Sequence, residues 1–272
     1  MLFDTHTHIN DRRFNEDRNE IMEEIRCSDV GFICDVGFDL ASSEKSVALA
    51  KKYDFCYAVV GCHPHDAKNF SDRQLDRIRA LSKQPKVVAI GEIGLDYHYD
   101  FSPRNVQRYW FERQLGLALE LGMPICIHER EAAGDVMEIL KDSGVFSKER
   151  TSLFPAKPDG SPDARLELHC FSGSAEIAAQ YVKLGASFGI GGPITYKNAR
   201  KAVEVVAQTD LCHILLETDC PYLTPVPCRG KRNKPVYVEY VARRIAEIKG
   251  VSYEEVAKLT TLNAKRFFGI ES

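Results

Sequence analysis

Residues 87–96 read VVAIGEIGLD, a run that is apolar almost throughout and contains several β-branched side chains. A short run of this kind is typical of a parallel β-strand that is buried on both faces of its sheet. Similar runs recur along the chain, and the eight together are Met1–His8, Val30–Gly37, Cys56–His63, Val87–Asp96, Pro124–His128, Leu166–Phe171, Ala186–Gly191 and His213–Asp219. The sequence therefore predicts eight parallel strands.

Amphipathic helical patterns separate these runs. We expect helices at Asn15–Cys27, Ala41–Tyr53, Asp72–Ser82, Pro103–Leu121, Ala132–Ser143, Ala175–Leu184 and Asn198–Gln208, followed by Val236–Lys249 and Tyr253–Phe268. Eight alternating units favour an α/β fold of the closed (β/α)8 barrel type with C-terminal helices. An open doubly wound sheet would also alternate, but no GxGxxG or GxxxxGK[ST] loop supports its nucleotide-binding forms. Ser147–Arg165 contains three prolines and is expected to be a surface loop.

Length and composition agree with this prediction. A barrel of this type uses roughly 250 residues, so we expect residues 1–272 to form a single domain. Hydrophobic residues make up 44% of the chain and charged residues 28%, which excludes a wholly disordered protein. The apolar runs are too short to span a bilayer. The first residues, MLFDTHTHIN, lack the pattern of a signal peptide, so export is not expected.

The cysteine count and the net charge say less about function. The nine cysteines are an odd number without a CxxC pair, so we expect reduced thiols in the cytoplasm rather than a disulfide scaffold. The net charge of −3 neither favours nor opposes binding to a nucleic acid, which would require a local basic patch.

Histidines and carboxylates close several of the predicted strands. Each alone has an ordinary explanation, such as a packed histidine pair, a buried salt bridge or a helix cap. Because the carboxyl ends of parallel barrel strands share one face, we expect these side chains to converge there on metal. Their number exceeds the three protein ligands usual for one catalytic zinc, so two divalent ions (Zn, Mn, Fe or, less favourably, Mg) fit better. The six residues are His6, His8, Glu92, His128, His169 and Asp219.

Seven motifs occur in order along nearly the whole chain: DTHTHIN, GCHPHDA, GEIGLDY, PICIHERE, HCFSGS, ETDCPYL and RGKRN. In these motifs the chain resembles the TatD family of metal-dependent deoxyribonucleases, which lies within the amidohydrolase-like barrels. The resemblance implies that Glu92 bridges the two metals. It implies His6, His8 and Asp219 as the other ligands of one ion, and His128 and His169 as those of the second. The departures are the long Ser147–Arg165 segment, Lys234, where the family commonly has Glu, and Cys228, where a larger residue is frequent.

Further residues are candidates for substrate contact or support. His63 and His65 lie at the end of the third run, and the resemblance suggests that they contact substrate or hold an occasional third metal, with the ordering of a turn as the alternative. Asp96 and Tyr97 follow the GEIG motif and are either substrate contacts or plain loop residues. Glu217 lies two residues before the last carboxylate ligand, so it should also point inward and orient a ligand or water. Its alternative role is a buried pair with Lys or Arg.

A basic segment follows the last predicted strand, with Arg229, Lys231, Arg232 and Lys234 within six residues. A solvated charged loop is the ordinary interpretation. Its position beside the predicted metals also places Arg229 and Arg232 where they would contact a phosphate without reading base sequence.

The sequence thus predicts a divalent-metal-dependent hydrolase that cleaves DNA phosphodiester bonds with an activated water. Asp219 and Glu92 are the predicted catalytic residues, and Asp219 would accept the proton of that water. One alternative is a hydrolase of amides, lactones or phosphotriesters on the same scaffold. Another is a metal-binding or nucleic-acid-binding module without turnover. We expect no organic cofactor and no membrane, while the oligomeric state is open and a monomer is compatible with the sequence.

Overall fold

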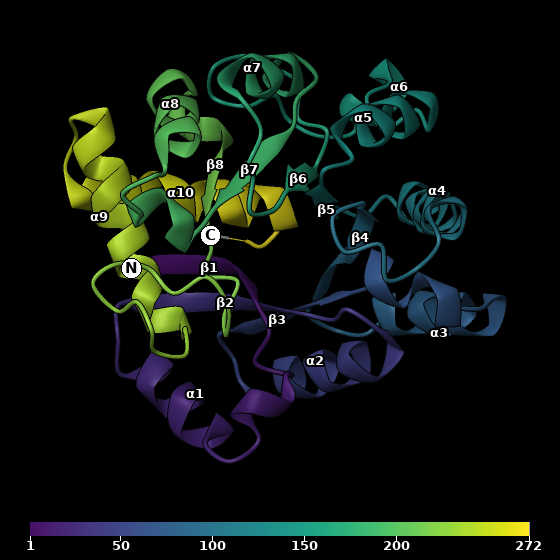
Figure 1. Ribbon diagram of the computed structural model, residues 1–272, viewed down its shortest axis with the longest axis horizontal. Helices are drawn as coiled ribbons and strands as arrows, with labels where there is room; N and C mark the ends of the chain where they lie inside the picture. The colour runs from purple at the N-terminus through teal and green to yellow at the C-terminus, as the bar shows by residue number, and fades with distance from the viewer. Residues whose placement is uncertain (272) are drawn as a thin grey trace.

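The computed structural model of the chain describes residues 1–271, and there eight parallel strands neighbour one another in sequence order. Figure 1 shows the helices placed around the outside of these strands. The predicted (β/α)8 barrel with C-terminal helices is therefore confirmed. The strands are β1 (Leu2–Thr7), β2 (Val30–Val36), β3 (Cys56–Val60), β4 (Val87–Asp96), β5 (Ile125–Arg130), β6 (Leu166–Leu168), β7 (Ser187–Ile190) and β8 (Ile214–Leu216).

The helices lie close to their predicted positions because their apolar faces repeat with the helical period. The bounds of α3 and α10 match the prediction, and most other ends differ by one or two residues. The helices are α1 (Arg18–Arg26), α2 (Leu40–Lys52), α3 (Asp72–Ser82), α4 (Arg104–Glu120), α5 (Ala133–Asp142), α6 (Lys148–Thr151), α7 (Ala175–Lys183), α8 (Arg200–Gln208), α9 (Val238–Lys249) and α10 (Tyr253–Phe268). Among residues 1–271, none is long and apolar enough to cross a membrane.

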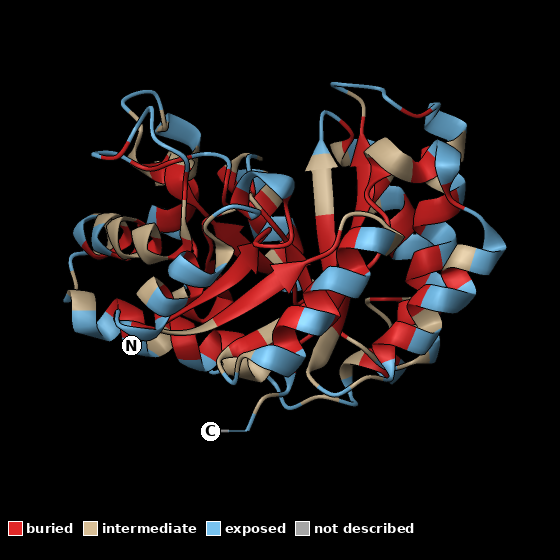
Figure 2. Ribbon diagram, turned by 90° about the horizontal axis from the view of Figure 1, so that it is seen from below, coloured by how far each residue is buried: buried red, intermediate tan, exposed pale blue. Residues whose placement is uncertain are grey.

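The strands are buried on both faces, as Figure 2 shows by their mostly red ribbons. One face packs against the helices. The other contributes to an inner apolar cluster that includes Phe3 of β1 and Leu215 of β8. Helix α10 adds Ala264, Phe267 and Phe268 to this inner cluster, so it closes the end of the barrel where the strands begin. The opposite end, where the strands finish, is left for polar side chains.

The barrel closes through the segment that follows β8 rather than through a long β8–β1 ladder. Thr7 forms an isolated parallel bridge with Cys220. The His8 amide donates to the Cys220 carbonyl at 2.8 Å, and the Asp219 amide donates to the His6 carbonyl at 2.9 Å. Backbone pairing therefore brings the Asp219 side chain beside His6 of β1 and His8, which directly follows it.

The bounds of β4 match the predicted run, so Glu92 lies inside the strand, four residues before its end, rather than closing it. The register with β5 is irregular between Ile90 and Ile93. Gly94 permits the close approach of the two strands there. Its φ is +143°, and a Cβ atom would lie 2.0 Å from the His128 carbonyl oxygen.

The prediction of a surface loop at Ser147–Arg165 is wrong for part of this segment. The segment begins with α6, and the Lys157 side chain farther along is only 2% exposed. Lys157 Nζ donates to the Ala186 carbonyl at 2.7 Å and to Ser187 Oγ at 2.9 Å, and it lies 3.1 Å from His213 Nδ1. The segment thus covers the beginnings of β7 and β8. The Lys157 amine can be buried there because these residues supply its hydrogen-bond partners.

We expect the free energy of unfolding to rise with pH relative to that of a Lys157→Met variant. Burial lowers the pKa of Lys157 to about 8, against 10.5 for an unperturbed lysine. Between these values the unfolded chain binds more protons than the folded one, so stability increases as pH rises, by up to about 3 kcal/mol. Urea unfolding of both proteins below and above this window measures the difference. A difference that is flat, or that falls with pH, would contradict the burial of a charged amine.

Candidate metal centre

The six predicted ligands meet at the end of the barrel where the strands finish. There a cavity of about 610 Å³ is lined by all of them except His6, which lies behind it fully buried. β1, β4 and β5 supply His6, Glu92 and His128 from within their strands. His8 and His169 directly follow β1 and β6, and Asp219 comes three residues after the end of β8. The parallel order of the strands therefore gathers side chains that are up to 213 positions apart in the sequence.

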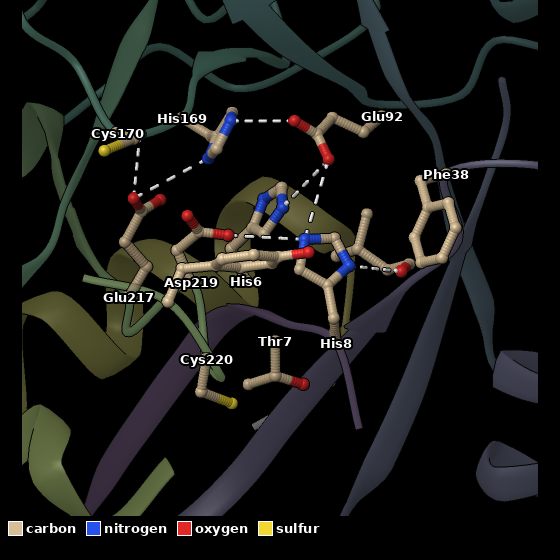
Figure 3. A network of polar contacts seen from close by, with 12 residues as sticks. His6, Thr7, His8, Phe38, Glu92, His169, Cys170, Glu217, Asp219 and Cys220 are labelled. Carbon is tan, nitrogen blue, oxygen red and sulfur yellow. Dashed lines mark hydrogen bonds and ion pairs between the residues drawn. The ribbon is translucent and has the colours of Figure 1, made fainter. Parts of the chain in front are cut away.

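Glu92 stands at the middle of the group, and its two carboxylate oxygens face different histidines. Oε2 lies 3.5 Å from His6 Nε2 and 3.7 Å from His8 Nε2. Oε1 lies 2.9 Å from both His128 Nδ1 and His169 Nε2. Figure 3 shows one oxygen of Glu92 joined to His169 and the other to His6 and His8. A carboxylate placed in this way has one oxygen available to each of two neighbouring cations.

The donors fit a divalent cation. His6 is fully buried, and neither of its ring nitrogens has a hydrogen-bond partner among residues 1–271. His169 Nδ1 also lacks a partner in the described part of the chain. Because a buried polar atom without a partner is costly, His6 Nε2, which faces Glu92 Oε2, points to a ligand that it coordinates, while His169 Nδ1 faces Glu217. Imidazole with carboxylate is a donor set that suits Zn, Fe and Mn.

Electrostatics keep the carboxylates of the centre ionised. Burial alone would raise the pKa of Glu92, but the facing imidazoles, with His63 and His169 foremost, hold it well below its usual range. Burial would likewise lower the pKa of His8, but Asp219 Oδ1, 3.3 Å from His8 Nε2, raises it to about 9. The centre is therefore built around negative charge that a cation would neutralise.

Hydrogen bonds turn two of the rings toward Glu92. His8 Nδ1 donates to the Val36 carbonyl at 2.8 Å, which leaves Nε2 for the centre. His128 Nε2 lies 3.0 Å from Asp96 Oδ2, which leaves Nδ1 for the centre. A partner on the outer nitrogen of a histidine ligand selects its tautomer and fixes the orientation of its ring.

Asp96 was predicted to contact substrate, but the geometry supports an orienting role instead. It is fully buried, and Oδ2 also lies 2.9 Å from His65 Nε2. Its other oxygen, Oδ1, accepts from the backbone amides of His98 and Tyr99. Both oxygens are therefore engaged within the protein.

We expect Asp96→Asn to weaken metal binding by about 10- to 100-fold, because loss of a carboxylate behind a ligand histidine has effects of this size. Calorimetric titration of metal-free protein with Zn²⁺ or Mn²⁺ measures the change. Asp100→Asn is the matched control, since Asp100 lies in the same loop but is exposed and pairs with Arg104. Equal affinities for the two variants would remove the orienting role of Asp96.

The remaining predicted residues fall into different places. His63 joins the cluster more closely than expected, with Nε2 3.4 Å from Glu92 Oε1, and burial lowers its pKa to about 3. Glu217 accepts from the Cys170 amide at 2.8 Å and lies 3.7 Å from His169 Nδ1, and its donor atoms gather with those of His6 and His169 closely enough to hold a cation. Tyr97 does not line the cavity, and its hydroxyl donates to Asp135, which also lies outside the cavity.

The basic segment after β8 does not line the cavity. Arg229 lies over the Tyr196 ring, with its guanidinium carbon 4.1 Å from the ring centroid. Acidic residues near the start of the chain hold two of the others, since Arg232 pairs with Asp17 and Lys234 pairs with Glu24. The predicted phosphate contacts by Arg229 and Arg232 are therefore not supported by their positions. Sequence reasoning missed the cavity residues Tyr99, Phe101, Arg130 and Tyr222.

A barrel with a histidine and carboxylate centre where its strands finish defines a metal-dependent hydrolase. A family model described as TatD related DNase matches residues 3–269. The chain belongs to the TatD family.

Individual relatives agree over the full length. The "Uncharacterized metal-dependent hydrolase YabD" of Bacillus subtilis is 45% identical over 99% of this chain and 100% of its own. The "3'-5' ssDNA/RNA exonuclease TatD" of Cronobacter sakazakii is 32% identical over 98% of this chain and 97% of its own. The crystal structure of YJJV, a TatD homolog from Escherichia coli, has a TM-score of 0.87 at 29% identity and covers 99% of this chain and 98% of that one. These relatives do not favour the alternative hydrolases or a module without turnover.

Proposed function

We propose that this protein is a nuclease that hydrolyses phosphodiester bonds of DNA with two divalent ions, Zn, Mn, Fe or Mg. The observation that carries the proposal is the placement of Glu92, whose two oxygens face separate sets of histidines. The family model and the relative named as an exonuclease of single-stranded DNA and RNA support the choice of substrate. In this proposal residues 1–272 act as one barrel domain. The nine free thiols fit a cytoplasmic location.

The geometry suggests how the donors divide between the ions. His6, His8 and Asp219 lie on the Oε2 side of Glu92 and would hold one ion. His128 and His169 lie on its Oε1 side and would hold the other. Divalent ions bound at such a centre lower the pKa of a water and neutralise charge on the phosphoryl group.

Asp219 is placed to take the proton of the attacking water. Its side chain reaches the cavity with 14% exposure, and its backbone has a φ of +54°, a left-handed conformation that is uncommon outside glycine. The hydrogen bond from its own amide to the His6 carbonyl holds it in this conformation. A fixed carboxylate at the cavity surface can accept a proton from water and pass it to the leaving oxygen.

The test is an assay on metal-reconstituted protein with 3′-labelled and 5′-labelled DNA, single-stranded and double-stranded, alongside RNA and a lactone panel. We expect shortened DNA products that a chelator prevents and that added divalent ion restores. The ladders from the two labels distinguish exonuclease from endonuclease action. Folded, metal-loaded protein that hydrolyses lactones and leaves every nucleic acid intact would overturn the proposal.

A further inference from the structure

Exposed apolar side chains gather at the metal cavity. Within residues 1–271, nine large apolar side chains are exposed, and four of them line this single cavity. Two of the four are Tyr99, which is 46% exposed, and Phe101, which is 55% exposed. Water-exposed aromatic rings around a polar centre mark a surface that binds a partner with flat apolar faces.

Tyr99 and Phe101 form a stacked pair in the loop after β4. Their ring centroids are 5.2 Å apart, and the ring planes differ by 26°. The His65 ring meets Phe101 edge-on, with centroids 4.7 Å apart. Since most of Phe101 remains exposed, the pair offers a free ring surface at the wall of the cavity.

Arg130, at the end of β5, adds a positive charge to this pair. Its guanidinium carbon lies 4.7 Å from the centroid of the Tyr99 ring. Among the described residues it is the only lysine or arginine that lines the cavity, and no carboxylate there forms an ion pair with it. It is exposed and therefore available to an anionic group.

The pair is also fixed relative to the metal centre. The Tyr99 amide donates to Asp96 Oδ1 at 2.9 Å, while Asp96 Oδ2 lies 3.0 Å from His128 Nε2. One buried carboxylate thus anchors both the aromatic loop and a candidate ligand. A group stacked on the rings would be held at a set distance from the bond that is cleaved.

We propose that Tyr99, Phe101 and Arg130 form a nucleotide subsite, in which the rings stack on an unpaired base and Arg130 contacts a phosphate beside the cleaved bond. This inference rests on the proposed nuclease function and adds the residues that would hold a nucleotide beside the cleaved bond. A base in a duplex is already paired and stacked, whereas an unpaired base has a free face for aromatic side chains. The subsite therefore selects single strands without selecting sequence.

Binding is tested first, in the Asp219→Asn background so that no product forms. Short single-stranded oligonucleotides carry one 2-aminopurine, whose fluorescence falls on stacking, at each position in turn. We expect quenching at one position, which the double variant Tyr99→Ala/Phe101→Ala abolishes. Tyr109→Ala is the matched control, because Tyr109 is 47% exposed and lies near an arginine, Arg113, but outside the cavity.

Kinetics with active protein then separate the base from the phosphate. Replacing the stacked nucleotide by an abasic residue should lower kcat/KM at least about fivefold in the unmodified protein and leave the double variant unaffected. Arg130→Gln should lower kcat/KM equally on the intact and the abasic substrate. It should also reduce the slope of log kcat/KM against log salt concentration by about one.

The outcomes distinguish this subsite from the function on which it rests. A protein that cleaves single strands but is indifferent to the abasic residue, or a double variant that still quenches, overturns the subsite alone. Position-specific quenching with no cleavage of any nucleic acid by the unmodified protein overturns the proposed function and leaves the subsite. Equal loss for the double variant and Tyr109→Ala also counts against the subsite, because it indicates a general effect on the fold.

Discussion

Asp219→Asn is expected to lower kcat/KM for phosphodiester hydrolysis at least about 10³-fold, the range for loss of a general base. The amide has the size of the carboxylate, but it does not accept a proton and it is a poor cation ligand. The hydrogen bond that holds this residue to the His6 carbonyl comes from its backbone, so the loop should keep its conformation. Initial rates over a range of substrate concentrations give kcat/KM, and thermal unfolding reports on the fold.

Asp142→Asn is the control for Asp219→Asn, since Asp142 is exposed at the end of α5 on the outside of the barrel. We expect its kcat/KM to stay within about threefold of the unmodified protein, as for surface substitutions away from a site. Near-normal turnover by Asp219→Asn would show that the proton goes elsewhere and would remove the proposed role of this carboxylate.

Glu92→Gln is expected to have an effect at least as large, about 10³-fold or more on kcat/KM, because one substitution weakens both halves of the centre. The ionised carboxylate lies within 3.7 Å of a ring nitrogen on each of five histidines. Glutamine keeps the shape, but it removes the charge and can offer only one oxygen. Metal content after dialysis, measured by plasma emission, should fall below two ions per chain together with activity.

His128→Ala separates a bridging role of Glu92 from loss of a single ligand. His128 faces only Oε1 of Glu92, so its removal should abolish turnover while the ion beside His6 and His8 is retained. Glu112→Gln, on the exposed face of α4, is the control and should change neither the turnover nor the number of bound ions. If Glu92→Gln and His128→Ala lose the same number of ions, Glu92 does not bridge.

Much of the architecture is readable in the sequence because it depends on local patterns. The alternation of short apolar runs with helical periodicity predicts eight strands, and the bounds of α3 and α10 match exactly those observed. The donors could be predicted as a group for the same reason. Each lies on or just after a strand, and parallel strands in a barrel bring these positions to one face.

Other features depend on how distant segments pack, and no local signal reports them. Lys157 reads as part of a proline-rich surface loop, yet it is buried against β7 and His213. Arg232 reads as a phosphate contact, yet it pairs with Asp17, which is 215 positions away in the sequence. A charged side chain pairs with an oppositely charged or polar group that lies close to it in space. Which group that is depends on the conformation of the loops.

By itself the sequence determined the order of strands and helices, the barrel and the set of histidines and carboxylates at one end of it. The resemblance implied that Glu92 bridges, but only the tertiary structure showed which oxygen faces which rings, that Asp96 lies behind His128, and that Tyr99 and Phe101 form a wall of the cavity. Periodic burial is a local property of the chain, so the order of apolar and polar residues predicts it. The direction of a side chain within a site depends on hydrogen bonds between strands and loops that meet only when the barrel closes.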